Sequence, residues 1–159
     1  MLDSYSAVCA TLSRLALWLA GAGLVLMAAF VAWLVIGRYV LNDSPTWTEP
    51  AVLLLMSWFI ILGAAVGVRE RDHLGFEVGL ATAPAPVALA MRLGTEILVA
   101  AFGVAMSVYG GQLAAGTWAD STPMIGLPKG LDYVPMIIGG VLIAMFSAEK
   151  LLRILAGRE

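Results

Sequence analysis

The sequence predicts an all-α integral membrane protein, with four transmembrane helices in a bundle and an interfacial amphipathic segment between the second and third helices. Two observations carry this prediction. Hydrophobic residues make up 61% of the 159 residues and charged residues only 13%, whereas a soluble domain carries roughly 25% charged residues. The mean hydropathy is +0.93, which implies more apolar surface than a chain of this length could bury within itself. We expect a single membrane domain over residues 1–159.

Long uncharged stretches define the four spans. A hydrocarbon core about 30 Å thick needs roughly 20 helical residues at about 1.5 Å each. The stretches that approach this length are about 15–37, 51–68, 97–119 and 131–148. The first is longer than the roughly 7–15 residues of a signal-peptide core, and few basic residues precede it, so we expect a retained membrane helix.

The segment between the second and third spans, about 74–91, is not expected to cross the membrane. It contains Glu77, Pro84 and Pro86. Two prolines so close together remove helical donors and favour an extended or bent backbone. We therefore expect this segment to lie along the membrane interface or against the bundle.

The distribution of Lys and Arg predicts the orientation. An even number of spans places both termini on one side of the membrane. Seven of the nine basic residues lie on the side of the termini: Arg14, Arg69, Arg71, Arg92, Lys150, Arg153 and Arg158. Only Arg38 and Lys129 lie on the other side. Cytoplasmic loops are enriched in Lys and Arg, so both termini are predicted to be cytoplasmic.

The run "RERDH", residues 69–73, places five ionisable residues at the predicted end of the second span. Alone, it could be a catalytic cluster, a metal site or the solvated end of a helix. His73 is the only imidazole in the chain, and neighbouring helical residues point in different directions, which argues against a metal site. The run is therefore predicted to fix the depth of the helix at the cytoplasmic edge. A net charge of −2 also makes nucleic acid an unlikely partner.

Small residues recur at a spacing of four in three of the spans. Such faces let helices approach closely in lipid. The third span carries Gly103, Ser107, Gly111, Ala115 and Ala119; the second carries Gly63 and Gly67; the fourth carries Gly140, Ala144 and Ala148. These faces could pack within the bundle or against another protein, and the sequence leaves both readings open.

Polar side chains are nearly absent from the spans. Gln112 is the only strongly polar one well inside a span, and Glu96 is expected to pair with Arg92 one turn away. Ion-coupled carriers usually keep charged residues facing their pathway, and broken helices often mark their binding sites. One histidine excludes a bis-histidine haem, and the single Cys9 is read as a small hydrophobe. The chain is predicted to be a membrane subunit without its own active site, cofactor or metal.

Both predicted outer loops carry interfacial features. Tyr39 and Trp47 suit an aromatic belt. Thr46 and Glu49 match a Thr-x-x-Glu capping box; alternatively, Glu49 pairs with Arg38 or with a partner. The second loop places apolar residues between two prolines, and we expect them to lie against the bilayer edge or a partner subunit. They are Met124, Ile125 and Leu127, between Pro123 and Pro128.

Taken in order, "RYV", "WTE", "LGAA", "VRERDHL" and "TPMIGLPKGLDYVP" resemble the small membrane subunit of tripartite ATP-independent periplasmic (TRAP) transporters, the DctQ-like family. The matching positions are Arg38, Tyr39, Trp47, Glu49, Trp58, Leu62, Gly63, Ala64, Arg69, His73, Pro123 and Pro128. The family commonly has two acidic residues after the tryptophan, and here Pro50 takes the second place.

The resemblance implies an accessory subunit, in a bacterial inner membrane, that supports a large DctM-like transport subunit. A soluble periplasmic protein would deliver substrates, small organic anions such as carboxylates, and an ion gradient, typically of sodium, would drive uptake without ATP. Charges on the expected outer face could help to dock that protein: Arg38, Asp43, Glu49, Asp120, Lys129 and Asp132. One alternative is a self-sufficient four-helix carrier or channel that works as an oligomer. Another is an intramembrane enzyme that uses Asp72 and His73.

Overall fold

The structure is a computed structural model that describes residues 2–43, 45–70 and 84–156. Four of its helices are long and apolar enough to cross a membrane, which confirms the predicted fold class. They are α1 (Leu2–Tyr39), α2 (Thr48–Glu70), α4 (Ala85–Gly116) and α5 (Val134–Leu155), and a short 3₁₀ helix, η1 (Lys129–Tyr133), leads into α5.

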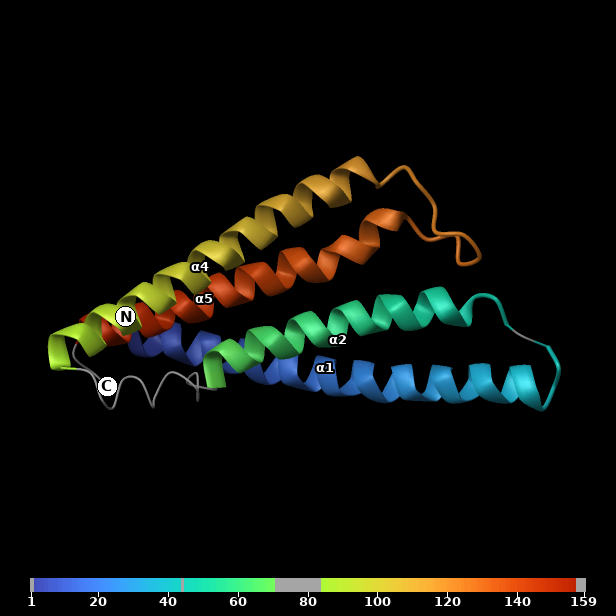
Figure 1. The fold of residues 1–159 in the computed structure, drawn as a ribbon, viewed down its shortest axis with the longest axis horizontal. Coiled ribbons are helices and arrows are strands. Elements are labelled where there is room, and N and C mark those ends of the chain that lie inside the picture. The colour runs from blue at the N-terminus through green and yellow to red at the C-terminus, as the bar shows by residue number, and fades with distance from the viewer. Residues whose placement is uncertain (1, 44, 71–83, 157–159) are drawn as a thin grey trace.

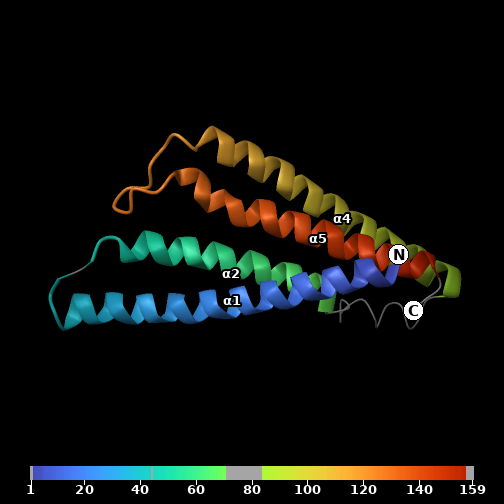
Figure 2. The ribbon, with the colours of Figure 1, turned by 180° about the vertical axis from the view of Figure 1, so that it is seen from behind.

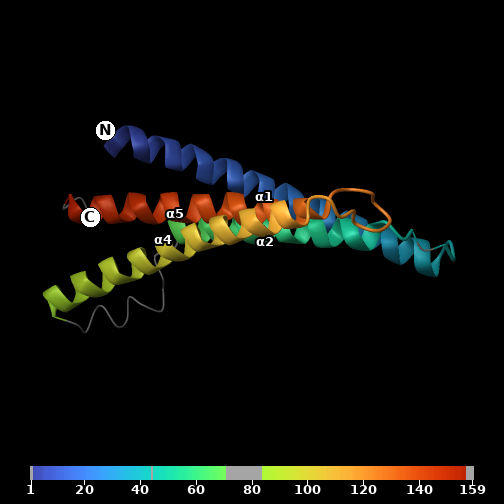
Figure 3. The same cartoon turned by 90° about the horizontal axis from the view of Figure 1, so that it is seen from above.

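The helices form two hairpins that lie side by side, α1 with α2 and α4 with α5 (Figure 1). The start of α1 and the end of α5 lie at one end of the bundle, here called the terminal end, and both hairpin loops lie at the other, the loop end (Figures 1 and 2). Contacts between α2 and α5 join the hairpins. The hairpins diverge towards the loop end, and at the terminal end α1 and α4 extend to opposite sides of α5 (Figure 3).

The buried core lies in the half of the bundle near the terminal end, where the hairpins converge. Phe146 of α5 is fully buried at its centre. It is surrounded by small or branched residues of three helices: Cys9, Ala16, Ala20, Leu62, Ala65, Val66, Leu142 and Ile143. Large side chains such as Trp18, 79% exposed, cover the outside. This distribution fits a bundle whose outer surface is solvated by lipid tails.

Helices α1 and α4 begin several turns earlier than the spans predicted from charge. Helix α1 begins at Leu2, and α4 begins at Ala85, so residues 85–91 are the first turns of α4 and not a separate interfacial element. Pro84 has an extended backbone and precedes the helix, while Pro86 lies in its first turn, where the missing N–H has no partner to lose. The prolines therefore start a helix here. Residues 74–83 of the expected interfacial segment lie outside the described residues.

Helix α2 begins at Thr48, so the predicted capping box at Thr46 is out of register. Trp47 is therefore the N-cap residue, and its carbonyl accepts a hydrogen bond from the Ala51 N–H at 3.2 Å. The buried Thr48 hydroxyl donates to the carbonyl of Pro45. Glu49 lies in the first turn, where an acidic side chain interacts favourably with the helix dipole.

Candidate functional site

Two adjacent glycines let α5 pack closely on two neighbours at one level. A Cβ on Gly140 would lie 2.6 Å from the carbonyl oxygen of Gly103 and 2.6 Å from Ser107 Oγ, both on α4. A Cβ on Gly139 would collide with Ile61 of α2. Helix α5 is therefore the centre of the bundle, and the glycine pair sets how near its neighbours lie.

The seam between α4 and α5 is lined by small residues on both sides. The Ser107 hydroxyl lies 3.1 Å from the carbonyl of Gly103 and 3.2 Å from the carbonyl of Ile137, to which it can donate a hydrogen bond across the seam. A Cβ on Gly103 would lie 2.8 Å from the backbone nitrogen of Ala144. Within a bilayer, such contacts replace the hydrophobic drive that water supplies elsewhere.

The stripe of small residues read from the sequence does not follow this seam along its whole length. The α4 side of the seam is formed by Gly103, Ser107, Gly110 and Ala114. A step of four residues advances about 40° beyond a full turn, so a strict spacing of four leaves the seam. A Cβ on Gly111 would meet no described residue within 4 Å, and Ala115 and Ala119 are exposed.

The predicted packing residues thus divide into two groups. The structure brings together Gly103, Ser107, Gly140 and Ala144 at the α4–α5 seam. Gly63 and Gly67 of α2 behave like Gly111, because a Cβ on either would meet no atom within 4 Å in the part of the chain that the structure describes. These outward positions leave room for a partner, and no described residue of this chain fills it.

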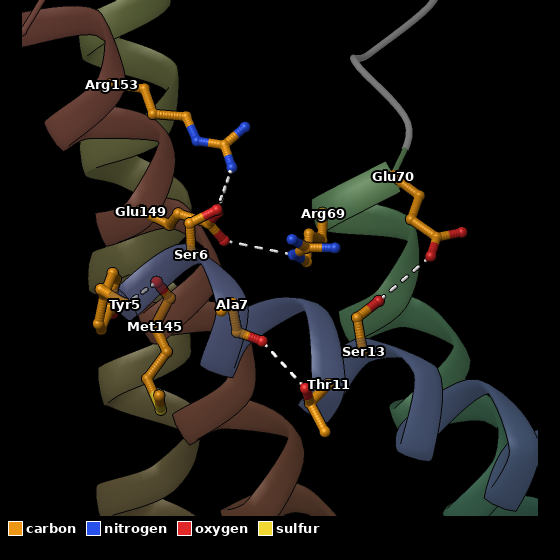
Figure 4. A network of polar contacts seen from close by, with 10 residues as sticks. All are labelled: Tyr5, Ser6, Ala7, Thr11, Ser13, Arg69, Glu70, Met145, Glu149 and Arg153. Atoms are coloured by element: carbon orange, nitrogen blue, oxygen red, sulfur yellow. Dashed lines mark hydrogen bonds and ion pairs between the residues drawn. The ribbon is translucent and has the colours of Figure 1, made fainter. Parts of the chain in front are cut away.

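A polar cluster fastens the helices at the terminal end (Figure 4). Glu149 of α5 is 4% exposed and accepts from Arg69 Nε of α2 at 3.3 Å and from Arg153 at 2.6 Å. Arg153 also donates to Ser6 Oγ of α1 at 2.7 Å. The first arginine of "RERDH" therefore reaches across the bundle, and one carboxylate connects three helices.

Further contacts surround this cluster. The Tyr5 hydroxyl donates to the carbonyl of Met145 at 3.0 Å, and Ser13 donates to Glu70 at 3.3 Å (Figure 4). Glu96 of α4 lies 3.9 Å from Lys150 of α5, an inter-helix pair that the sequence did not predict. All four helices are thus joined by polar contacts at this end.

Sequence reasoning missed Glu149. Counting Lys and Arg to predict orientation takes no account of acidic residues. A usable signal was present, because Glu149 lies in the apolar fourth helix with Arg153 four residues later. The second half of "RERDH", with Asp72 and His73, lies outside the described residues.

The charged residues proposed for docking all lie exposed at the loop end, and both hairpins contribute to them. They are Arg38, Asp43, Glu49, Asp120, Lys129 and Asp132. Within the described ranges, none of the six forms an ion pair, including the pair considered between Arg38 and Glu49. Trp47 packs edge-on against Phe30, with ring centroids 5.7 Å apart.

The loop before η1 folds into a small hairpin. Ser121 pairs with Pro128, and the Lys129 N–H donates to the Asp120 carbonyl at 2.8 Å. Met124, just after Pro123, has a left-handed backbone (φ 74°) and is 67% exposed. Ile125 and Leu127 line a shallow hollow beside the start of α2, together with Pro50 and Leu54.

These features define a multi-pass helical membrane protein whose helices meet backbone to backbone at the centre, and whose described charged side chains lie towards the two ends of the bundle. Residues 27–157 match the family of tripartite ATP-independent periplasmic transporters, DctQ component. The chain belongs to this family. It is therefore a permease subunit of a bacterial inner-membrane transporter, not a member of an enzyme family.

Three bacterial relatives illustrate the match. The chain is 26% identical to the sialic acid TRAP transporter small permease protein SiaQ of Vibrio cholerae, over 82% of this chain and 77% of that protein. It is 26% identical to a putative TRAP transporter small permease protein of Haemophilus influenzae, over 81% and 80%. It is 31% identical to the C4-dicarboxylate TRAP transporter small permease protein DctQ of Pseudomonas aeruginosa, over 77% and 61%.

Proposed function

We propose that this chain is an accessory scaffold subunit that holds a large DctM-like subunit in the membrane and helps a periplasmic binding protein to dock. The large subunit carries the substrate, and a sodium-ion gradient drives uptake. The observation that carries this proposal is the packing of α5. At the level of Gly139 and Gly140 its neighbours approach so closely that a Cβ has no room on either side, so a substrate has no room there.

The names of the relatives support a proposal for the substrate class. Their names specify sialic acid and C4-dicarboxylates, both of which are small organic anions with carboxylate groups. We propose a substrate of the same class for the complex that contains this chain. We assign its recognition to the large subunit and the binding protein, because in the described part of this chain the exposed charges lie towards the two ends of the bundle.

Copurification tests the proposed assembly. A tagged copy of the chain is purified in mild detergent from its native membrane, and untagged neighbours are identified by mass spectrometry. We expect a large multi-span permease in a fixed ratio to the chain, and a periplasmic binding protein in weaker association. Recovery of the chain alone, or only with further copies of itself, would contradict the proposal.

The orientation is tested by reporter fusions. The structure places the start of α1 and the end of α5 at one end, and the charge distribution assigns that end to the cytoplasm. A reporter fused after Glu159 should read cytoplasmic, and reporters near Asp43 and Lys129 should read periplasmic. A periplasmic signal after Glu159 would overturn the assignment.

Docking is tested by reversing two loop charges. Asp120 and Lys129 are exposed and adjacent across the base of the loop hairpin. Exposed charges at a rim act mainly on association rate, so we expect the combined Asp120→Lys and Lys129→Glu variant to reduce uptake severalfold at low binding-protein concentration and at low salt. The membrane complex should remain assembled. Unchanged uptake across a full binding-protein titration would exclude these residues from docking.

A further inference from the structure

One face of α1 carries an arginine and a tryptophan one helical turn apart. Arg14 and Trp18 are both exposed, Trp18 by 79%. At about 100° per residue, they lie roughly opposite the buried side of the helix, which packs on α2 and α5. The buried side is formed by Cys9, Ser13, Ala16 and Ala20. The face with Arg14 and Trp18 is therefore turned away from the other described helices.

The position of Trp18 along α1 places Arg14 at the level of lipid headgroups. Trp and Tyr gather at the two surfaces of a bilayer. Trp18 and Tyr39, each 79% exposed, lie about 32 Å apart along the helix at about 1.5 Å per residue, close to the roughly 30 Å thickness of the hydrocarbon core. Arg14 lies about 6 Å beyond Trp18, towards the terminal end. Its guanidinium therefore reaches the layer that contains the lipid phosphates.

Arg14 carries a positive charge that the described part of the chain does not neutralise. Arg69 and Arg153, also at the terminal end, both pair with Glu149. Arg14 forms no ion pair with any described residue. A guanidinium group binds phosphate strongly, because it can donate two parallel hydrogen bonds to the phosphate oxygens. The charge of Arg14 is thus available to an anion from outside the chain.

The residues that follow Trp18 leave space for an acyl chain. Gly21 and Ala22 lie on the same face one turn deeper in the membrane, and a Cβ on Gly21 would meet no described residue within 4 Å. Leu17 and Leu19, 51% and 53% exposed, stand on either side of this space. An acyl chain that lies between the two leucines has its glycerol beside the Trp18 ring and its phosphate at Arg14.

We propose that Arg14 and Trp18 bind the headgroup of an anionic phospholipid, with phosphatidylglycerol as the model ligand. The phosphate accepts hydrogen bonds from the Arg14 guanidinium, and the Trp18 ring contacts the glycerol backbone. A zwitterionic lipid binds less well, because its own cation offsets the charge of the phosphate. This site requires only a bilayer, so it goes beyond the proposed function and does not depend on the large subunit.

Native mass spectrometry of the purified chain in detergent tests the site, with phosphatidylglycerol and phosphatidylcholine as probes. One basic side chain near the membrane surface corresponds to about fivefold in the binding of an anionic lipid, so Arg14→Gln should raise the phosphatidylglycerol concentration at half-occupancy about fivefold. Binding of phosphatidylcholine should not change. Arg14→Lys keeps the charge and should retain most of the preference for phosphatidylglycerol.

A pair of tryptophan variants tests the role of the ring. Trp18→Leu should weaken the binding of both lipids, because the ring contacts the glycerol backbone that they share. Trp33→Leu is the matched control, since Trp33 is an exposed tryptophan of the same helix nearer the loop end. It should leave the binding of both lipids unchanged. Equal effects of the two substitutions would contradict the assignment of Trp18 to the site.

The remaining outcomes are decided as follows. Arg14 and Trp18 are exposed, so without added lipid the variants should melt at the temperature of the unmodified chain. Unchanged phosphatidylglycerol binding in Arg14→Gln would overturn the proposal. If that variant does not fold, an unmodified chain that binds both lipids equally well would overturn it. Displacement of phosphatidylglycerol by excess inorganic phosphate would do so too, because the site would then bind a free anion.

The occupant in the native membrane is identified by a photoreactive benzoyl-phenylalanine at Leu15, which is 58% exposed and adjacent to Arg14. An adduct with phospholipid supports the proposal. An adduct with another protein, or with a second copy of the chain, overturns it.

Discussion

Gly140→Leu is expected to prevent the α4–α5 hairpin from closing. A Cβ at this position would already lie 2.6 Å from the Gly103 carbonyl oxygen and 2.8 Å from the Ser107 backbone nitrogen. The nearest atoms include backbone that cannot rotate away, so the helices must separate along the seam. We expect a loss of at least about 3 kcal/mol in the free energy of unfolding. Little monodisperse protein should remain by size-exclusion chromatography in mild detergent.

Gly111→Leu is the matched control on the same seam-forming hairpin. Gly111 lies in α4, and a Cβ there would meet no atom of residues 2–43, 45–70 or 84–156 within 4 Å. The isolated chain should therefore keep its elution profile and its melting temperature. If both substitutions destabilise the chain equally, the α4–α5 seam is not packed as described. If neither destabilises it, close approach of the helices at Gly140 is unnecessary.

Glu149→Ala is expected to produce the second large effect. The Glu149 side chain is 5% exposed and holds Arg69, itself 19% exposed, at 3.3 Å. Removing one partner of a buried pair leaves the other without compensation, which costs about 3 kcal/mol. Thermal unfolding followed by circular dichroism in detergent measures this cost, and α2 should be the helix that separates.

A double-mutant cycle shows whether the pair is the cause. If it is, Arg69→Ala combined with Glu149→Ala should cost clearly less than the sum of the single changes. Glu70→Gln changes an exposed carboxylate next to Arg69 and should shift the free energy of unfolding by under about 1 kcal/mol. Additive single effects would mean that Glu149 stabilises the bundle by some route other than Arg69.

The four membrane helices could be predicted from the sequence because charge-free length and apolar composition set them directly. The starts of α1 and α4 could not, because charged residues near the membrane surface stop a count of apolar residues without stopping a helix. Pro86 illustrates this point: proline in a helix interior breaks the helix, but in the first turn it is well tolerated, and sequence alone did not show which position it holds.

The contacts between helices were harder to predict than the helices themselves. Gly103 and Gly140 could be recognised as packing residues, but not as partners of each other. The stripe drifted off the seam because a spacing of four is longer than a helical turn, so Gly110 and not Gly111 faces α5. The role of Glu149 depends on which helix lies beside α5, and that is known only once the two hairpins are placed together.

The central claim is that this chain serves a transporter without providing the transport pathway. Reconstitution into proteoliposomes with an imposed sodium gradient tests it most directly, with uptake of labelled C4-dicarboxylate or sialic acid compared for the chain alone, the chain with the large subunit, and both with the binding protein. The account predicts uptake only when all three are present, and none above empty liposomes for the chain alone. Gradient-dependent uptake by the purified chain alone would contradict the account and establish the four-helix carrier in its place.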